Sequence, residues 1–199
     1  MAIPDSNEQA RIGEVTAADS RTITAQCYEL YQAPPLGALV EAGQPRAFAV
    51  VQGIRTEPVD PGRPVLARGR HALSLEQIYR DNPQIERLLT TRFDALVVGH
   101  EGGEGISQLL PPSPPPIHSF VVVSSPGDVR KFTEGLDFLR FLVNAGPPLA
   151  DEVVVACLRE AAKGQPDREE FIVRAGRALA TELVGESARL TALLRRIRL

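Results

Sequence analysis

The chain has 199 residues, of which 43% are hydrophobic and 24% are charged, and its formal net charge at pH 7 is −3. This composition excludes a chain that is disordered throughout. The slight negative charge argues against a protein that binds nucleic acid through its overall charge. Aromatic residues make up only 5%, so a base-stacking surface for single strands is poorly supplied.

The N-terminal sequence MAIPDSNEQA lacks the apolar segment of a signal peptide, and no run approaches about 18 uninterrupted apolar residues. We therefore expect a soluble, cytoplasmic protein that has no membrane partner. The polar residues 1–10 are expected to form a flexible N-terminus.

The stretch from residue 11 to residue 54 predicts short strands separated by turns. The apolar residues that alternate with polar neighbours, in the period of a half-buried strand, are Ile23, Ala25 and Cys27. Residues 38–42 and 47–51 are further apolar runs. Short strands at this spacing are typical of a small closed barrel. Residues 56–70, with three prolines and two glycines, are interpreted as turns around one short strand, Pro64–Ala67.

A pair of helices is predicted between residues 74 and 90, inserted into the β-rich half. Ser74 and Gln77 form a capping-box pair, which indicates that a helix starts there. Asn82 is expected to cap a second helix that has Pro83 in its first position and ends near Thr90.

A hairpin and one more strand complete the β-rich half. Residues 93–99 and 106–110 predict two strands joined by a six-residue connection at 100–105, and residues 119–124 predict the last strand. The connection holds three potential metal ligands, His100, Glu101 and Glu104. We favour a plain hairpin turn over a metal site, because a metal site needs three or four ligands that converge on one ion.

The chain becomes helical after residue 125. One apolar stripe predicts a helix from Asp128, as its cap, to residue 144, and further stripes predict helices at 151–163 and 168–183 and a continuation to the C-terminus. The predicted class is therefore α+β, with a small β-barrel at 11–125 and a C-terminal α-helical bundle at 126–199.

The sequence offers no catalytic residue, no cofactor site and no metal site. Cys27 and Cys157 lie in apolar segments, so we expect two buried free thiols, with a disulfide as the alternative. Ser125 and Asp128 are interpreted as helix-start residues, because no Gly-x-Ser-x-Gly motif surrounds the serines.

The basic C-terminal segment is the one candidate contact site. Residues 168–199 contain seven basic and four acidic side chains. The arginines that could contact a partner or a phosphate group are Arg189, Arg195, Arg196 and Arg198. The alternatives are a helix docked by its leucines with a solvated basic face, a helix that packs on a partner protein, and a phosphate contact.

The β-rich half resembles the HAS barrel of HerA-type DNA translocases, a domain that is also similar to the N-terminal barrel of ATP synthase subunits. The segments that carry the resemblance are IGEV, PLGALVEA, AFAVVQGI, LEQIYRDNPQIERLLTTRFDALVVG at 75–99 and LLPPSPPPIHSFVVVSSPGDVRKF at 109–132. It covers about residues 10–132 and rests on apolar, glycine and proline positions rather than on chemical motifs. In that family the barrel sits on a motor ring and contacts partners, including a NurA-type nuclease.

The chain departs from that family where the motor domain would begin. No GxxxxGK[ST] motif occurs, and the glycine-rich residues 99–105 contain no lysine to bind phosphate. The resemblance therefore implies a non-catalytic interaction or assembly module, with a protein partner or self-association, as an accessory to a DNA-processing ATPase or nuclease. A nucleic-acid-binding protein that uses the basic C-terminal helix is the alternative, and an enzyme with an unrecognised site is the third hypothesis.

Overall fold

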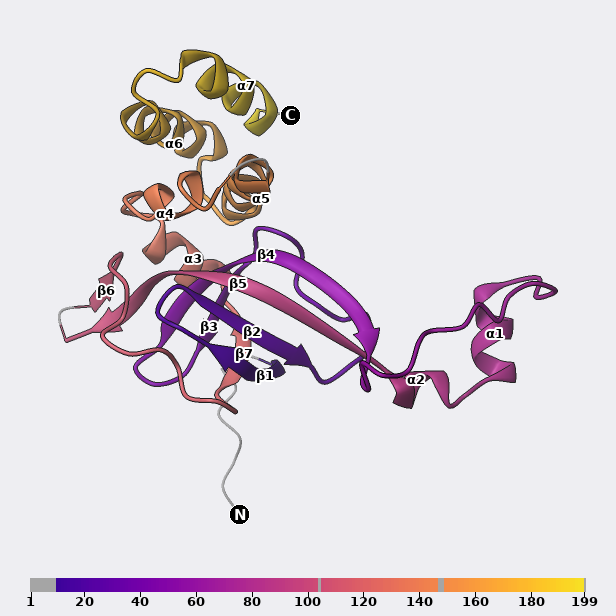
Figure 1. The fold of residues 1–199 in the computed structure, drawn as a ribbon. Helices are drawn as coiled ribbons and strands as arrows, with labels where there is room; N and C mark the ends of the chain where they lie inside the picture. Colours follow the sequence, from indigo (N-terminus) through magenta and orange to yellow (C-terminus); the bar gives the residue numbers. More distant parts are fainter. Residues whose placement is uncertain (1–9, 104, 147–148, 199) are drawn as a thin grey trace.

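The fold is described from a computed structural model that places residues 10–103, 105–146 and 149–198 (Figure 1). Residues 1–9 of the N-terminus that is predicted to be flexible lie outside the described residues. Within them, seven strands and seven helices form a mixed α+β fold, so the α+β part of the predicted class is confirmed. The strands are β1 (Arg11–Ala18), β2 (Thr22–Cys27), β3 (Leu39–Ala42), β4 (Ala47–Pro58), β5 (Leu89–Gly102), β6 (Gly105–Ser107) and β7 (Phe120–Val123). The helices are α1 (Leu75–Asp81), α2 (Ile85–Leu88), α3 (Pro126–Phe132), α4 (Leu139–Val143), α5 (Leu149–Lys163), α6 (Arg168–Glu182) and α7 (Ser187–Ile197).

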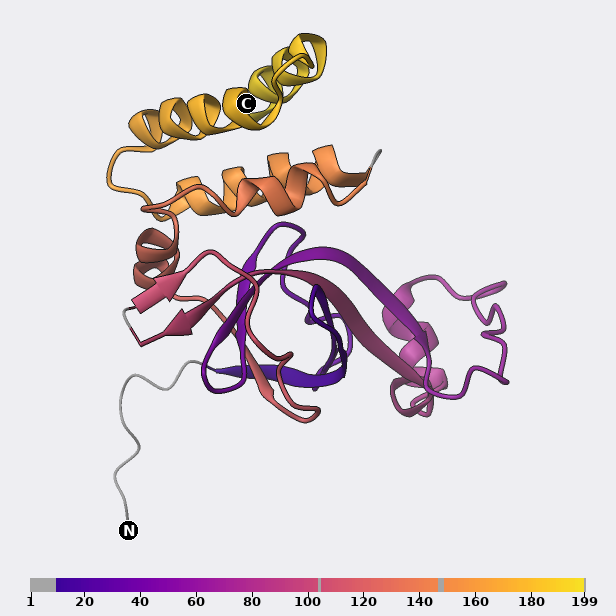
Figure 2. The same cartoon turned by 60° about the vertical axis from the view of Figure 1, so that its left-hand side comes forward.

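The strands form one antiparallel sheet that closes on itself. Its order is β2-β1-β7-β3-β4-β5-β6, and a further pairing of β2 with β5 joins the first six into a ring of hydrogen bonds (Figure 2). The long strands β4 and β5 pair along their length, from Ala47 opposite His100 to Pro58 opposite Leu89. The short β6 lies outside the ring and pairs with the end of β5.

Two apolar cores use opposite faces of the same strands. Ala49, Val51 and Phe93 point into the ring, where small and β-branched side chains fill the interior. Phe48 and Val50, which alternate with them, point outward into a second core under the helices. Because both faces of β4 are buried, its first residues form the continuous apolar run 47–51 instead of an alternating pattern.

The second core joins the sheet to the C-terminal helices. Helix α5 lies over the ring, and α6 and α7 lie over α5 (Figure 1). Phe132 of α3 is 1% exposed, and its ring centroid lies 5.1 Å from those of Phe48 and Phe138. No helix in the described part of the chain is long and apolar enough to cross a membrane.

The predicted single helix over 128–144 is wrong, because the chain forms α3 and α4 with a break between them. The Gln108 side chain occupies the break: Nε2 donates to Phe132 O at 2.6 Å and to Gly135 O at 2.9 Å, and Oε1 accepts from Phe138 N at 3.0 Å. These bonds satisfy backbone groups that a continuous helix would have paired internally. Ser125, rather than Asp128, is the N-cap of α3.

Three predictions between residues 58 and 107 are also wrong. Pro64–Ala67 is not a strand, because the chain leaves the sheet after Pro58 and finds no neighbouring strand. Asn82 ends α1 instead of starting α2, and its Nδ2 donates to Ile78 O at 3.0 Å. The hairpin connection is shorter than six residues, because β5 and β6 pair as far as Gly102 and Gly105.

Candidate interaction site

Residues 59–88, here called the arm, project from the ring between β4 and β5 and contain α1 and α2 (Figures 1 and 2). The arm begins where the β4–β5 ladder ends, at the pair Pro58 and Leu89, with Val59 N donating to Leu88 O at 2.9 Å. None of its residues is buried. The arm is therefore folded without an apolar core of its own.

The arm exposes apolar side chains in a number that is unusual for a solvent-facing segment. Six large ones are at least 36% exposed: Val59, Val65, Leu66, Leu73, Leu75 and Leu88. Its two helices, of seven and four residues, are too short to be stable by themselves in water. A segment of this kind gains free energy when another surface covers its apolar side chains.

A groove of about 420 Å³ lies at the root of the arm. Its apolar lining comes from Pro58, Val59, Pro64, Val65, Leu66, Ile85, Leu88 and Leu89. Three arginines and one aspartate complete the lining: Arg63, Arg68, Arg87 and Asp60. The groove is thus apolar at its centre and carries an excess of positive charge.

Side-chain contacts hold residues 68 and 69 of the arm against residues 78 and 82. Arg68 Nη1 donates to Asn82 Oδ1 at 3.0 Å, and Gly69 lies against Ile78, where a Cβ atom would approach Ile78 Cδ1 to 2.7 Å. Ser74 caps α1 as predicted, with Oγ accepting from Gln77 N at 3.3 Å. These contacts give the arm a defined shape.

Tyr31, in the β2–β3 connection, fixes the arm relative to the ring. Its φ of 66° is left-handed, and its N–H donates to Thr91 Oγ1 at 2.8 Å. The Tyr31 and Tyr79 rings meet edge to face, 6.5 Å apart, and their hydroxyl groups share a hydrogen bond. That bond raises the pKa of Tyr79 to about 12. A strained residue held in this way is typical of a functional segment.

Two of the four predicted contact arginines are used within the chain. Arg189 Nη2 donates to Asp151 Oδ1 at 2.7 Å and to Val143 O at 3.0 Å. Arg196 forms an ion pair with Glu152. Both acidic residues belong to the first turn of α5, so these arginines attach α7 to α5.

The other two predicted arginines, Arg195 and Arg198, are exposed and form no ion pair with another described residue. Helix α7 itself is docked by its apolar face, because Leu193 and Ile197 are buried in the core under the helices. The structure therefore separates the four arginines into two that stabilise the fold and two that face solvent.

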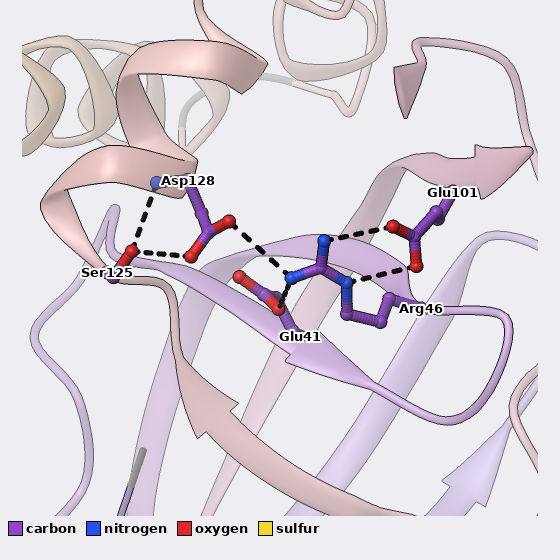
Figure 3. Close-up of polar contacts among 5 residues, drawn as sticks. All are labelled: Glu41, Arg46, Glu101, Ser125 and Asp128. Carbon is purple, nitrogen blue, oxygen red and sulfur yellow. Dashed lines mark hydrogen bonds and ion pairs between the residues drawn. The ribbon is translucent and has the colours of Figure 1, made fainter. Parts of the chain in front are cut away.

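A partly buried charge cluster around Arg46 fixes α3 to the ring (Figure 3). Arg46 Nη1 lies 2.8 Å from Glu41 Oε2 and 3.5 Å from Asp128 Oδ1, and Nε and Nη2 donate to both carboxylate oxygens of Glu101 at 3.1 Å. Glu41 is 3% exposed, and its Oε1 has no hydrogen-bond partner among the described residues. Ser125 Oγ accepts from Asp128 N at 3.1 Å.

The cluster shifts the titration of its members. The hydrogen bonds from Arg46 lower the pKa of Glu101. Burial raises the pKa of Asp128, but the hydrogen bond from Ser125 and the charge of Arg46 outweigh this effect, so its pKa is lowered overall. One cation thus holds three carboxylates from β3, β5 and α3, which makes the cluster a structural tie.

The remaining chemical candidates are accounted for by packing. Cys27 and Cys157 are buried free thiols, as predicted. Burial raises their pKa values to about 11 and about 12, so neither is a thiolate at neutral pH. Of the loop residues weighed as metal ligands, Glu104 lies outside the described residues. No group of three His, Cys, Asp or Glu side chains in the described ranges is placed to hold a metal ion.

The exposure of the arm is the feature that the sequence did not reveal. The capping residue Ser74 predicts α1, but nothing in the local pattern predicts that no other part of the chain covers it. Comparison with protein-family models and with curated protein sequences finds no match for this chain.

Proposed function

We propose that this chain is a non-enzymatic protein-interaction module that binds its partner through the arm. One observation carries the proposal: residues 59–88 hold six exposed large apolar side chains and no buried residue. Each such side chain contributes about 1.5–3 kcal/mol when it is fully buried against another surface. Covering even half of them provides a favourable term of the size that a specific interface needs.

The groove at the root of the arm defines the chemistry of the partner. Its apolar centre accepts a large apolar side chain, and Arg63, Arg68 and Arg87 favour carboxylates around that side chain. The expected ligand is a protein segment with one or two apolar anchors flanked by Asp or Glu. A cationic segment would meet three arginines and only one aspartate, Asp60.

The resemblance to HAS barrels gives the module a context. The ring of six strands supports a barrel of that type, and the helices after residue 125 support a bundle packed on it. A barrel without a motor domain fits an accessory to a separate DNA-processing ATPase or nuclease. Nucleic-acid binding by α7 is the weaker proposal, because Arg189 and Arg196 are already paired and only Arg195 and Arg198 are left for phosphate groups.

Selection from a displayed library of random peptides tests the proposal. We expect the folded chain to enrich peptides that combine large apolar residues with flanking Asp or Glu. Binding of a synthetic selected peptide, measured by fluorescence anisotropy, should weaken at least about tenfold in Leu66→Ser and in Arg87→Glu, since each change removes about 1.4 kcal/mol or more.

Val184→Ser is the matched control, because Val184 is an apolar residue that is at least as exposed as Leu66, 83% against 67%, and lies between α6 and α7, far from the arm. It should leave the peptide affinity unchanged. Selected peptides that bind Leu66→Ser and Arg87→Glu as well as the original chain would place the binding surface elsewhere and refute the role of the arm.

A further inference from the structure

The turn between α6 and α7 presents an exposed apolar side chain. Val184 is 83% exposed, the highest value of any described large apolar residue outside the arm. The residue before it, Leu183, is 2% exposed and packs in the core under the helices. Gly185 has a φ of +87°, and Glu186 N donates to Leu183 O at 2.9 Å, so the backbone closes the turn. Val184 is therefore held out from the surface on a defined turn.

Acidic side chains flank Val184 on both sides. Glu182 and Glu186 are each two positions away, and both are exposed. Glu186 Oε2 accepts from Arg189 Nη1 at 3.2 Å, but the glutamate side chain is still 52% exposed. Among the exposed large apolar residues that the structure describes outside the arm, only Val184 has an acidic neighbour within two positions on each side. The turn thus has the composition of the ligand proposed for the groove at the root of the arm, an apolar anchor between carboxylates.

The groove at the root of the arm has the complementary features, and its lining is open to a partner. Val59, Leu66 and Leu88 are 54%, 67% and 36% exposed, so a side chain from another molecule can reach them. Arg63 and Arg87 are exposed and form no ion pair with another described residue. Two cations beside an accessible apolar centre match one apolar side chain between two carboxylates.

We propose that the α6–α7 turn of one copy of this chain occupies the groove at the root of the arm of a second copy. Val184 enters the apolar centre of the groove, and Glu182 and Glu186 face Arg63 and Arg87. The arm and the turn lie apart in both views of the fold, so one chain cannot make this contact with itself (Figures 1 and 2). The inference rests on the proposed function, because it names a second copy of the chain as a partner of the arm.

Sedimentation equilibrium of the full chain between about 10 μM and 1 mM tests the contact. A contact with one apolar anchor is small, so we expect reversible association with a Kd of roughly 0.1–1 mM. Val184→Ser and Glu182→Lys should each weaken the association at least about fivefold. Val173→Ser and Glu169→Lys are the matched controls, because they change exposed residues of the same types near the start of α6, and they should not change it. All four variants should still bind the selected peptides at micromolar concentration, where self-association of this strength is negligible.

Disulfide trapping identifies the two surfaces that meet. The native cysteines are buried, so Leu66→Cys and Val184→Cys each add one accessible thiol. In a glutathione redox buffer, a mixture of the two variants at about 0.2 mM each should form linked dimers of the two different chains several-fold faster than either variant links to itself. Equal rates would overturn the assigned contact.

The two proposals can fail separately. A chain that stays monomeric up to 1 mM but binds the selected peptides through the arm would refute the contact between copies and leave the proposed function standing. A chain that neither self-associates nor binds such peptides would refute both.

Discussion

Gly37→Ala is expected to lower the free energy of unfolding by about 3–4 kcal/mol. Gly37 has a φ of +82°, and a Cβ atom at this position would lie 2.3 Å from Cys157 N and 2.4 Å from the carbonyl carbon of Ala156. Both neighbours are backbone atoms of α5, so they cannot rotate away as a side chain can. The alanine therefore both strains the turn before β3 and pushes α5 off the ring.

Urea denaturation measures this loss, and Gly53→Ala is the matched control. Gly53 lies in β4, its φ is not left-handed, and no atom lies within 4 Å of its Cβ position. We expect Gly53→Ala to change the unfolding free energy by less than about 1 kcal/mol. Equal effects of the two substitutions would show that α5 does not depend on its contact with Gly37.

Arg46→Met should cost about 2–3 kcal/mol at pH 7. The substitution keeps the apolar stem but leaves Glu41, Glu101 and Asp128 facing one another without a cation. Removal of one partner from a buried ion pair costs about 3–5 kcal/mol. The lower value applies because Arg46 is 34% exposed and solvent partly screens its charge.

The cost of Arg46→Met should shrink in acid. The pKa values of Glu101 and Asp128 are lowered in the folded chain from ordinary values of 4.5 and 3.8. Their contribution to stability is therefore complete above these ordinary values and is lost as the pH falls through the lower folded values. In the variant, protonation instead relieves the repulsion between carboxylates. The two stability curves should converge as the pH falls below about 4.

Unfolding measured between about pH 3 and pH 7, a range that spans the ordinary carboxylate pKa values, tests both points. Arg55→Met is the control, because Arg55 also contacts two carboxylates, those of Asp94 and Glu57. Both are more than a third exposed, whereas Glu41 beside Arg46 is only 3% exposed. It should cost less than about 1 kcal/mol. A cost for Arg46→Met that is no larger, or that does not change with pH, would contradict the role given to the cluster.

The strands of the ring were predictable because their pattern is local. Ile23, Ala25 and Cys27 are all buried, as their alternation with polar residues predicts. The extent of β4 and β5 was not predictable, because their outer ends carry polar residues and are held by pairing with each other. Local pattern reports which face of a strand is apolar, but pairing decides where the strand ends.

Contacts between distant residues account for what the sequence did not predict. Gln108 satisfies the backbone between α3 and α4, and no helical pattern signals a side chain that arrives from outside the helix. Arg189 and Arg196 form ion pairs with Asp151 and Glu152, which lie 38 and 44 residues away in the sequence. The exposure of the arm is a property of the same kind, because capping and apolar spacing describe a helix without showing what covers it.

Replacement of residues 60–87 by Asn-Gly tests most directly whether the arm serves binding instead of folding. Val59 and Leu88 are joined by a hydrogen bond at the end of the β4–β5 ladder, so a two-residue turn can close the hairpin there. The shortened chain should keep its unfolding free energy within about 1 kcal/mol, because it loses no buried side chain. It should also lose all binding of the peptides selected by the full chain. A shortened chain that fails to fold, or that still binds those peptides, would contradict the assignment of the arm as the interaction site.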